Sequence, residues 1–166
     1  MTNVSCSVRA AKLAALLVAA LAMGACAKNP TSQDVGALAN ASAATPGSQQ
    51  DFVVNVGDRV FFNSDSSELT PQSIGTLDKQ AQWLRSYAQY SFIVEGHADE
   101  RGTREYNIAL GARRAQAVHD YLVSRGVQAH RMRTISYGKE RPVAVCDDIS
   151  CWSQNRRSVT VLNASS

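Results

Sequence analysis

The sequence predicts an α/β sandwich, in which a mixed four-stranded sheet carries two main helices packed on one face. Short runs of β-favouring residues alternate with two longer segments in which apolar residues recur every three to four positions. A hydrophobic share of 45% is enough for a core and excludes wholesale disorder. A hydrophobic run near the start, followed by a cysteine, indicates that this domain is exported.

Four strands are expected, at residues 58–62, 91–96, 132–137 and 157–162, because these runs are rich in valine, isoleucine, threonine and aromatic residues. The simplest packing of four strands and two amphipathic helices places both helices on one face of the sheet.

Two helices are expected between these strands. The first begins at Thr70-Pro71, an N-cap residue followed by a proline at the first helical position. Its apolar face consists of Ile74, Leu77, Ala81, Leu84 and Ala88. The second helix runs from about Glu105 to Ser124 and ends against Gly126, at the C′ position.

Residues 1–25 are predicted to be a secretory signal peptide. The run LAALLVAALAMGA at residues 13–25 carries no charge, and it is shorter than the about 20 apolar residues that span a membrane. Arg9 and Lys12 provide the basic flank before it, and small residues precede Cys26.

The segment Met23-Gly24-Ala25-Cys26 resembles a bacterial lipobox, in which the cysteine is lipid-modified and becomes the new N-terminus. Met23 departs from the leucine usual at its position. The alternative is ordinary cleavage after Ala22-Met23-Gly24, which leaves an unanchored protein. Ala27 follows the cysteine, and the lack of aspartate there favours sorting to the outer membrane by family analogy.

The exported chain divides into a tether and a domain. Residues 26–50 contain Cys26 followed by a stretch rich in alanine, serine, asparagine and glutamine, with few large apolar side chains. Such a stretch cannot recover the cost of ordering, which predicts a flexible tether. Residues 51–166 form the expected domain.

The basic charge of the chain belongs largely to the signal peptide. Removing residues 1–25 takes away two basic residues and no acidic one, which leaves 15 basic against 14 acidic residues, or a net charge of +1. Nucleic-acid binding, which requires a clustered basic patch, therefore has no compositional support.

One segment has the placement of a ligand site. Residues 94–103 run from a strand through a glycine-containing loop to a helix start, where sites are common. Asn107, Gly111 and Arg114 form one stripe on that helix. Gly111 costs about 1 kcal/mol relative to alanine. It indicates either that something approaches the backbone there or that this face is simply solvated.

These residues also carry a family resemblance. The segments FIVEGHADERGTREYN, IALGARRAQAVHDYL, SYGKERP and NRRSVTV resemble the OmpA-like domains, and among them the peptidoglycan-associated lipoproteins, over nearly all of residues 52–162. The resemblance implies non-covalent binding of peptidoglycan through the meso-diaminopimelate of its stem peptide, with no enzymatic activity and no cofactor. It also implies an outer-membrane lipoprotein with its domain in the periplasm, the β-propeller protein TolB as a partner, and a Tol/Pal role in envelope integrity and cell division.

The resemblance assigns roles to individual residues. Asp99 would pair with the ammonium of diaminopimelate, and the Arg114 guanidinium would hold its carboxylate as a fork. Backbone N–H groups at Gly102 and Thr103, at the helix start, would donate to further carboxylate oxygens. Replacing Asp99 or Arg114 by alanine is expected to abolish wall binding without unfolding the domain.

Other residues in the matched segments leave alternatives open. Asn107 is either an organiser of the binding loop or a local cap of the turn. Arg157, in Asn155-Arg156-Arg157, is either part of the site or a structural partner for acidic residues. His97 is expected to be structural, because a lone histidine at a strand end is more often hydrogen-bonded than catalytic.

Two other functions were weighed. A metal hydrolase using His97, Asp99 and Glu100 is disfavoured, because neighbouring strand residues point to opposite faces and no second histidine completes a ligand set. A structural or partner-binding lipoprotein that does not bind peptidoglycan remains the alternative.

The remaining cysteines are expected to pair. Cys6 leaves with the signal peptide and Cys26 is lipidated, so Cys146 and Cys151 are the only mature thiols left in an oxidising compartment. We therefore expect a disulfide between them, and the alternative is a reduced pair in a loop.

Overall fold

The computed structural model describes residues 44–163 of the chain. The predicted signal peptide, the lipidation site at Cys26 and the tether up to residue 43 lie outside this range. Among the described residues, no helix is both long and apolar enough to cross a bilayer.

The elements in chain order are α3 (Gln49–Asp51), the π-helical turn η1 (Phe52–Gly57), β1 (Arg59–Phe61), α4 (Pro71–Ser86), β2 (Ser91–His97), α5 (Arg104–Ser124), the 3-10 turn η2 (Ala129–Arg131), β3 (Met132–Gly138), α6 (Ile149–Asn155) and β4 (Arg157–Asn163).

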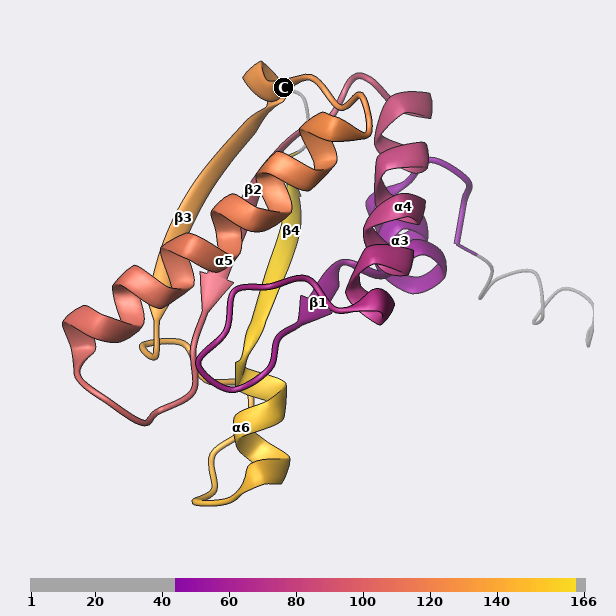
Figure 1. Ribbon diagram of the computed structural model, residues 1–166. Coiled ribbons are helices and arrows are strands. Elements are labelled where there is room, and N and C mark those ends of the chain that lie inside the picture. Colours follow the sequence, from indigo (N-terminus) through magenta and orange to yellow (C-terminus); the bar gives the residue numbers. More distant parts are fainter. Residues whose placement is uncertain (1–43, 164–166) are drawn as a thin grey trace, which may run out of the picture. The chain divides into compact units, whose positions relative to one another are not determined.

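The four strands form one mixed sheet in the order β1-β4-β2-β3. β2 and β3 are parallel, and β4 runs antiparallel to both β1 and β2. Figure 1 shows α5 crossing β2 and β3, with α4 beside it. Phe92 and Val94 of β2 are buried beneath the helices, whereas Ile93 between them points to the open face and is only half-buried. The predicted α/β sandwich is confirmed.

Helix α4 begins as the sequence predicts and ends earlier. Thr70 Oγ1 accepts a hydrogen bond from the Ser73 N–H at 3.1 Å and caps the helix. At the other end the Arg131 guanidinium donates to the carbonyls of Leu84, Tyr87 and Tyr90. Because these carbonyls bind Arg131, the chain turns away after Ser86, and Ala88, which was expected on the buried face, is exposed.

Residues 44–50, which the sequence analysis assigns to the tether, contact the domain. The Tyr90 hydroxyl donates to the Gly47 carbonyl at 2.8 Å. The Gly47 N–H and the Trp83 indole N–H both donate to one oxygen of Asp51. Phe52 then packs on Trp83 with ring centroids 4.9 Å apart. The compact unit therefore starts at Ala44.

Helix α5 and strand β2 approach each other closely at two glycines, Gly111 of α5 and Gly96 of β2. A Cβ at Gly111 would clash with Ser136 Oγ and lie 2.8 Å from the Gly96 carbonyl oxygen. The backbone that approaches Gly111 is therefore that of the sheet, so the expected close approach at this position is confirmed and the alternative of a solvated face is wrong. This contact fixes the start of α5 against the end of β2.

Replacing Gly111 by alanine is expected to lower the free energy of unfolding by about 1–3 kcal/mol, because overpacking against backbone outweighs the gain in helix propensity. Gly75 of α4 is the matched control, since a Cβ there meets nothing within 4 Å. Gly75→Ala should be stabilising by up to about 1 kcal/mol. Urea denaturation of both variants measures the two signs, and a stabilising Gly111→Ala would contradict the packing argument.

Candidate functional site

A cavity of about 290 Å³ opens between the loop after β1 and the loop that joins β2 to α5. The first loop contributes Ser64 and Asp65, and the Tyr106 hydroxyl donates to the Asp65 carboxylate across the opening. Of the residues expected to bind a ligand, three line the cavity: Asp99, Gly102 and Asn107. Its remaining lining is Arg101, Tyr106 and Leu110.

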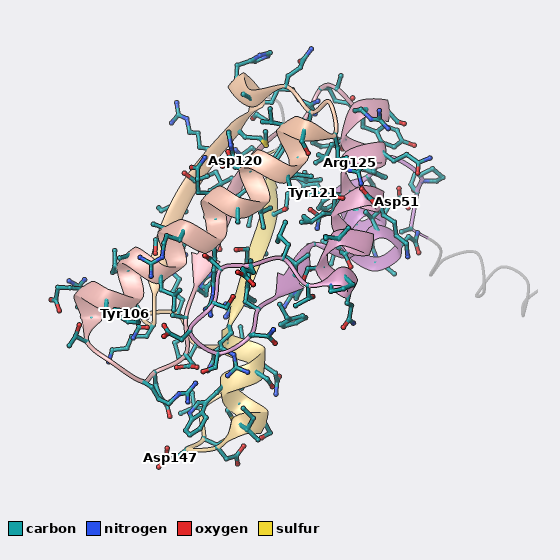
Figure 2. The ribbon with its side chains drawn as sticks, viewed as in Figure 1. Asp51, Tyr106, Asp120, Tyr121, Arg125 and Asp147 are labelled. Carbon is teal, nitrogen blue, oxygen red and sulfur yellow. A yellow bond between two sulfur atoms is a disulfide. The ribbon has the colours of Figure 1, made fainter. Side chains whose placement is uncertain are left out.

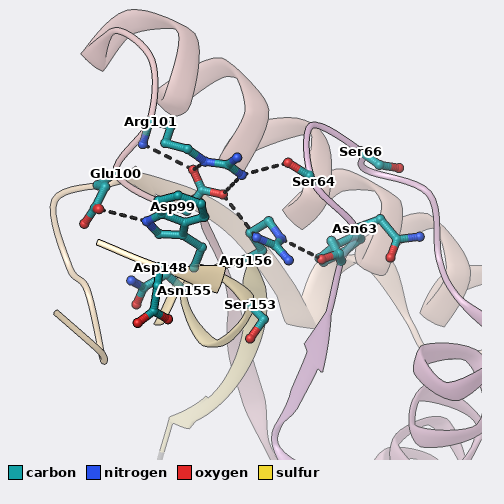
Figure 3. Close-up of polar contacts among 12 residues, drawn as sticks. Asn63, Ser64, Ser66, Asp99, Glu100, Arg101, Asp148, Ser153, Asn155 and Arg156 are labelled. Carbon is teal, nitrogen blue, oxygen red and sulfur yellow. Dashed lines mark hydrogen bonds and ion pairs between the residues drawn. The ribbon is translucent and has the colours of Figure 1, made fainter. Parts of the chain in front are cut away.

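Asp99 is the most heavily hydrogen-bonded group in the cavity. Oδ1 accepts from the backbone N–H and the Nε of Arg101, both at 3.2 Å. Oδ2 accepts from Arg101 Nη2 at 2.6 Å and from Arg156 Nη1 at 3.3 Å. Burial raises the pKa of Asp99, but the hydrogen bonds from the two arginines outweigh it, and the net effect lowers that pKa. Asp99 is thus an anion whose acceptor positions are filled (Figure 3).

The two arginines on Asp99 differ in exposure. The Arg101 side chain is 45% exposed, whereas that of Arg156 is 8% exposed. Arg101 also donates to Ser64 Oγ at 2.7 Å, so it connects the two loops around the cavity. Neither residue was assigned a role from the sequence. The sequence contained a signal for both arginines, because both lie in the matched segments and a buried carboxylate needs a cationic partner.

Side chains hold the backbone of the loop that follows Asp99. Asn107 Nδ2 donates to the Arg101 carbonyl at 2.8 Å. Lys139 Nζ donates to the carbonyls of Glu100 and Gly102, at 3.0 and 2.7 Å. Gly102 has a φ of +87°, a conformation that side-chain-bearing residues rarely adopt. These contacts define the loop geometry.

The start of α5 leaves donors free next to the cavity. Thr103 caps the helix, because its Oγ1 accepts from the Tyr106 N–H at 3.2 Å. Among residues 44–163, no acceptor lies within hydrogen-bond reach of the backbone N–H of Gly102 or of Thr103. Two N–H groups at a helix start are the donors that a carboxylate prefers.

Arg114 lies behind the cavity and is fully buried. Its guanidinium donates to the carbonyls of Ser66, His97 and Asn63 at 2.8, 2.7 and 3.1 Å. Burial lowers the pKa of Arg114 to about 10, which leaves it charged at neutral pH. Direct contact with a ligand therefore stays a prediction. The expectation that Arg114→Ala leaves the fold intact is revised, because that change strands three buried carbonyls.

The structure does not bring Arg157 to the cavity. Its guanidinium is buried and donates to the carbonyls of Asn155 and Arg141, at 3.4 and 3.2 Å. Asn155 is also structural, since its Oδ1 accepts from the backbone N–H of Val143 and Ala144. It is Arg156 that reaches Asp99, because adjacent residues of a strand start point to opposite faces.

The comparisons agree with this architecture. A family model described as the OmpA family matches residues 61–156. The peptidoglycan-associated lipoprotein of Rhizobium meliloti is 67% identical over 148 residues, which covers 88% of this chain and 84% of that protein. The protein of the same name from Brucella melitensis is 61% identical over 159 residues, or 95% of both chains. The chain belongs to the peptidoglycan-associated lipoproteins of the OmpA family.

Solved structures share the fold. The crystal structure of the peptidoglycan-associated lipoprotein from Burkholderia pseudomallei superposes with a TM-score of 0.62 at 42% identity, covering 64% of this chain and 90% of that one. The C-terminal domain of Helicobacter pylori MotB matches with a TM-score of 0.61 at 22% identity, covering 64% and 84%, which shows the fold alone.

His97 is a structural residue on the open face of the sheet. Its ring is buried and stacks on Tyr137, with centroids 5.6 Å apart. Neither ring nitrogen has a hydrogen-bond partner among the described residues, although Glu95 Oε2 lies 3.5 Å from Nε2. Burial lowers the pKa of His97 to about 4, assisted by the nearby positive charges of Arg157 and Arg141. His97 is therefore neutral at pH 7.

This burial makes stability depend on pH. Between the unfolded pKa of about 6.5 and the folded value of about 4, the unfolded chain binds a proton that the folded domain does not. The free energy of unfolding is therefore expected to fall as the pH decreases through this window. Between pH 7 and pH 4.5, His97→Phe should lose less free energy of unfolding in urea denaturation than the parent does. The control His130→Gln, at an exposed position, should lose as much as the parent. Equal slopes in parent and His97→Phe would contradict the assignment.

Proposed function

We propose that this protein is an outer-membrane lipoprotein that binds peptidoglycan non-covalently, by holding the meso-diaminopimelate of the stem peptide at the Asp99 cavity. The observation that carries the proposal is a buried, ionised carboxylate beside a partly exposed guanidinium and helix-start N–H groups that make no hydrogen bond among the described residues. Membership of the peptidoglycan-associated lipoproteins supports it. The alternative is a structural or partner-binding lipoprotein that does not hold the wall.

The free end of diaminopimelate is an amino acid, with an ammonium and a carboxylate, and the cavity offers partners for both. An ammonium that pairs with Asp99 must replace one of its present donors. The exposed Arg101 is the donor that can leave, while the buried Arg156 stays in place. The carboxylate then has the released Arg101 fork and the N–H groups of Gly102 and Thr103 beside it.

In this proposal Arg114 acts by holding backbone around the cavity, before any contact with the ligand. It is within reach of a ligand carboxylate only if the Ser66 carbonyl gives way, since that carbonyl covers its Nε. Its first role is to hold the loop that carries Ser64 and Asp65.

The exported chain as a whole would connect two layers of the envelope. Lipid on Cys26 holds one end in the outer membrane, and the domain holds the wall from the periplasmic side. The tether between them sets how far the two layers can separate. Such a bridge fits a role in the Tol/Pal system, envelope integrity and cell division.

Replacing Asp99 by asparagine tests the site, because it removes the charge and keeps the shape. Loss of one partner in a desolvated charge pair costs about 2–5 kcal/mol, so binding to isolated sacculi should weaken by at least tenfold. Asp147→Asn, on an exposed loop beside α6 (Figure 2), is the matched control. Circular dichroism checks the fold of both variants.

The ligand is tested by competition in the same sacculus assay. A soluble muropeptide whose stem peptide carries meso-diaminopimelate should displace the parent protein. A muropeptide that carries lysine at that position, and so lacks the second carboxylate at its free end, should displace it far less. If Asp99→Asn sedimented with sacculi as the parent does, the site would be wrong, and if the lysine muropeptide competed equally, the ligand would be wrong.

We also propose TolB as a partner that shares part of this surface, namely the loop from Glu100 to Asn107. Overlapping ligands exclude each other, and the coupling acts equally on both. Saturating muropeptide should therefore weaken TolB binding in calorimetry. An unchanged TolB affinity would rule out overlap, and no TolB binding would favour another kind of OmpA-like lipoprotein.

A further inference from the structure

A disulfide lies directly behind the loop that forms the candidate site. It joins Cys146 to Cys151, as predicted, and closes the start of α6. Asp148 caps this helix by accepting from the Ser150 N–H at 2.7 Å. At the other end, Asn155 holds the backbone of residues 143–144. Figure 1 shows α6 at the lower end of the sheet, away from α4.

Trp152 follows the disulfide and contacts the binding loop. Its indole Nε1 donates to Glu100 Oε1 at 2.8 Å. The Arg101 guanidinium lies over its ring, 4.3 Å from the ring centroid. Glu100 and Arg101 are the two residues that follow Asp99, so the indole contacts both side chains that come directly after the site carboxylate.

The surroundings of Trp152 indicate a role outside core packing. It is half-buried and does not belong to the hydrophobic core cluster. α6 has seven residues, fewer than an isolated helix needs to be stable in water. The disulfide and Asn155 therefore keep α6 formed, and α6 keeps the indole in place.

We propose that Trp152 is a positioning residue of the wall-binding site, and that the Cys146–Cys151 disulfide fixes it there. The inference rests on the proposed function, which places the ligand at Asp99. With the indole fixed, Glu100 is ordered before the ligand arrives, and the Arg101 guanidinium stays over the indole beside the cavity when it exchanges Asp99 for the ligand carboxylate. Without it, binding must supply the cost of ordering them, and affinity falls.

The test uses the protein as exported, purified in detergent, and measures its affinity for isolated sacculi. Trp152→Ala should weaken binding about fivefold or more, because the ligand must then order the freed Glu100 and Arg101 side chains. The double variant Cys146→Ser/Cys151→Ser should weaken it in the same direction. Combining all three changes should add little to Trp152→Ala alone, because the disulfide acts through the indole.

Two controls separate positioning from general destabilisation. Trp152→Phe keeps an aromatic face for Arg101 and should retain part of the affinity. Val145→Ala changes the most exposed large apolar side chain of the same loop and should leave affinity unchanged. The serine double variant should lower the free energy of unfolding whether or not Trp152 is present, so stability and affinity respond differently.

A second readout does not depend on the wall. The side-chain Nε resonance of Arg101 should shift in NMR spectra of the serine double variant and of Trp152→Ala, and not in Val145→Ala. If Trp152→Ala and the serine double variant both bound sacculi as tightly as the parent or more tightly, the inference would be wrong. The proposed function would still stand, because the parent binds. If the parent itself failed to bind sacculi, the proposed function would be wrong. The positioning role is tested separately, because an Arg101 Nε resonance that does not shift in Trp152→Ala or in the serine double variant would contradict it.

Discussion

The guanidinium of Arg114 is the constraint on which the candidate site depends. One buried cation donates to carbonyls from two segments, Asn63 and Ser66 after β1 and His97 at the end of β2. These segments lie far apart in the sequence, and Arg114 of α5 joins them by donating to both. The cavity is the space that remains on the solvent side of this junction. A change that removed the guanidinium would therefore release one wall of the cavity before it affected any ligand contact.

Other arginines perform the same task elsewhere in the domain. Arg131 closes the end of α4, Arg156 donates to the Phe62 carbonyl as well as to Asp99, and Arg157 holds the segment before α6. Irregular segments cannot pair their backbone carbonyls with each other as helices and strands do, and buried carbonyls need partners. A guanidinium, with five donors in a fixed plane, can supply several at once. This explains how long loops remain ordered around a small sheet.

Much of the fold could be predicted from local signals, and much of the site could not. The strands, the Thr70 cap and the Gly126 C′ position, which has a φ of +86°, are set by propensities and by contacts within a few residues. The insertion of β4 between β1 and β2 depends on pairing across the whole domain and has no local signal. The short α6 was missed because a disulfide and a distant asparagine stabilise it rather than its own sequence. Similarly, the sequence shows that Gly111 is unusual but not that Gly96 is what approaches it.

Because several arginines are buried, the isoelectric point of the chain does not describe the charge at the surface of the domain. The chain has a calculated value near 8.8, and residues 44–163 contain 14 lysines and arginines against 13 aspartates and glutamates. Four of these arginines and Asp99 are buried, which leaves 10 cations against 12 anions at the surface. The solvent-exposed surface of residues 44–163 therefore carries a slight net negative charge. Polyanionic surfaces will not attract this domain over long distances, and its encounters depend on contacts made at close range.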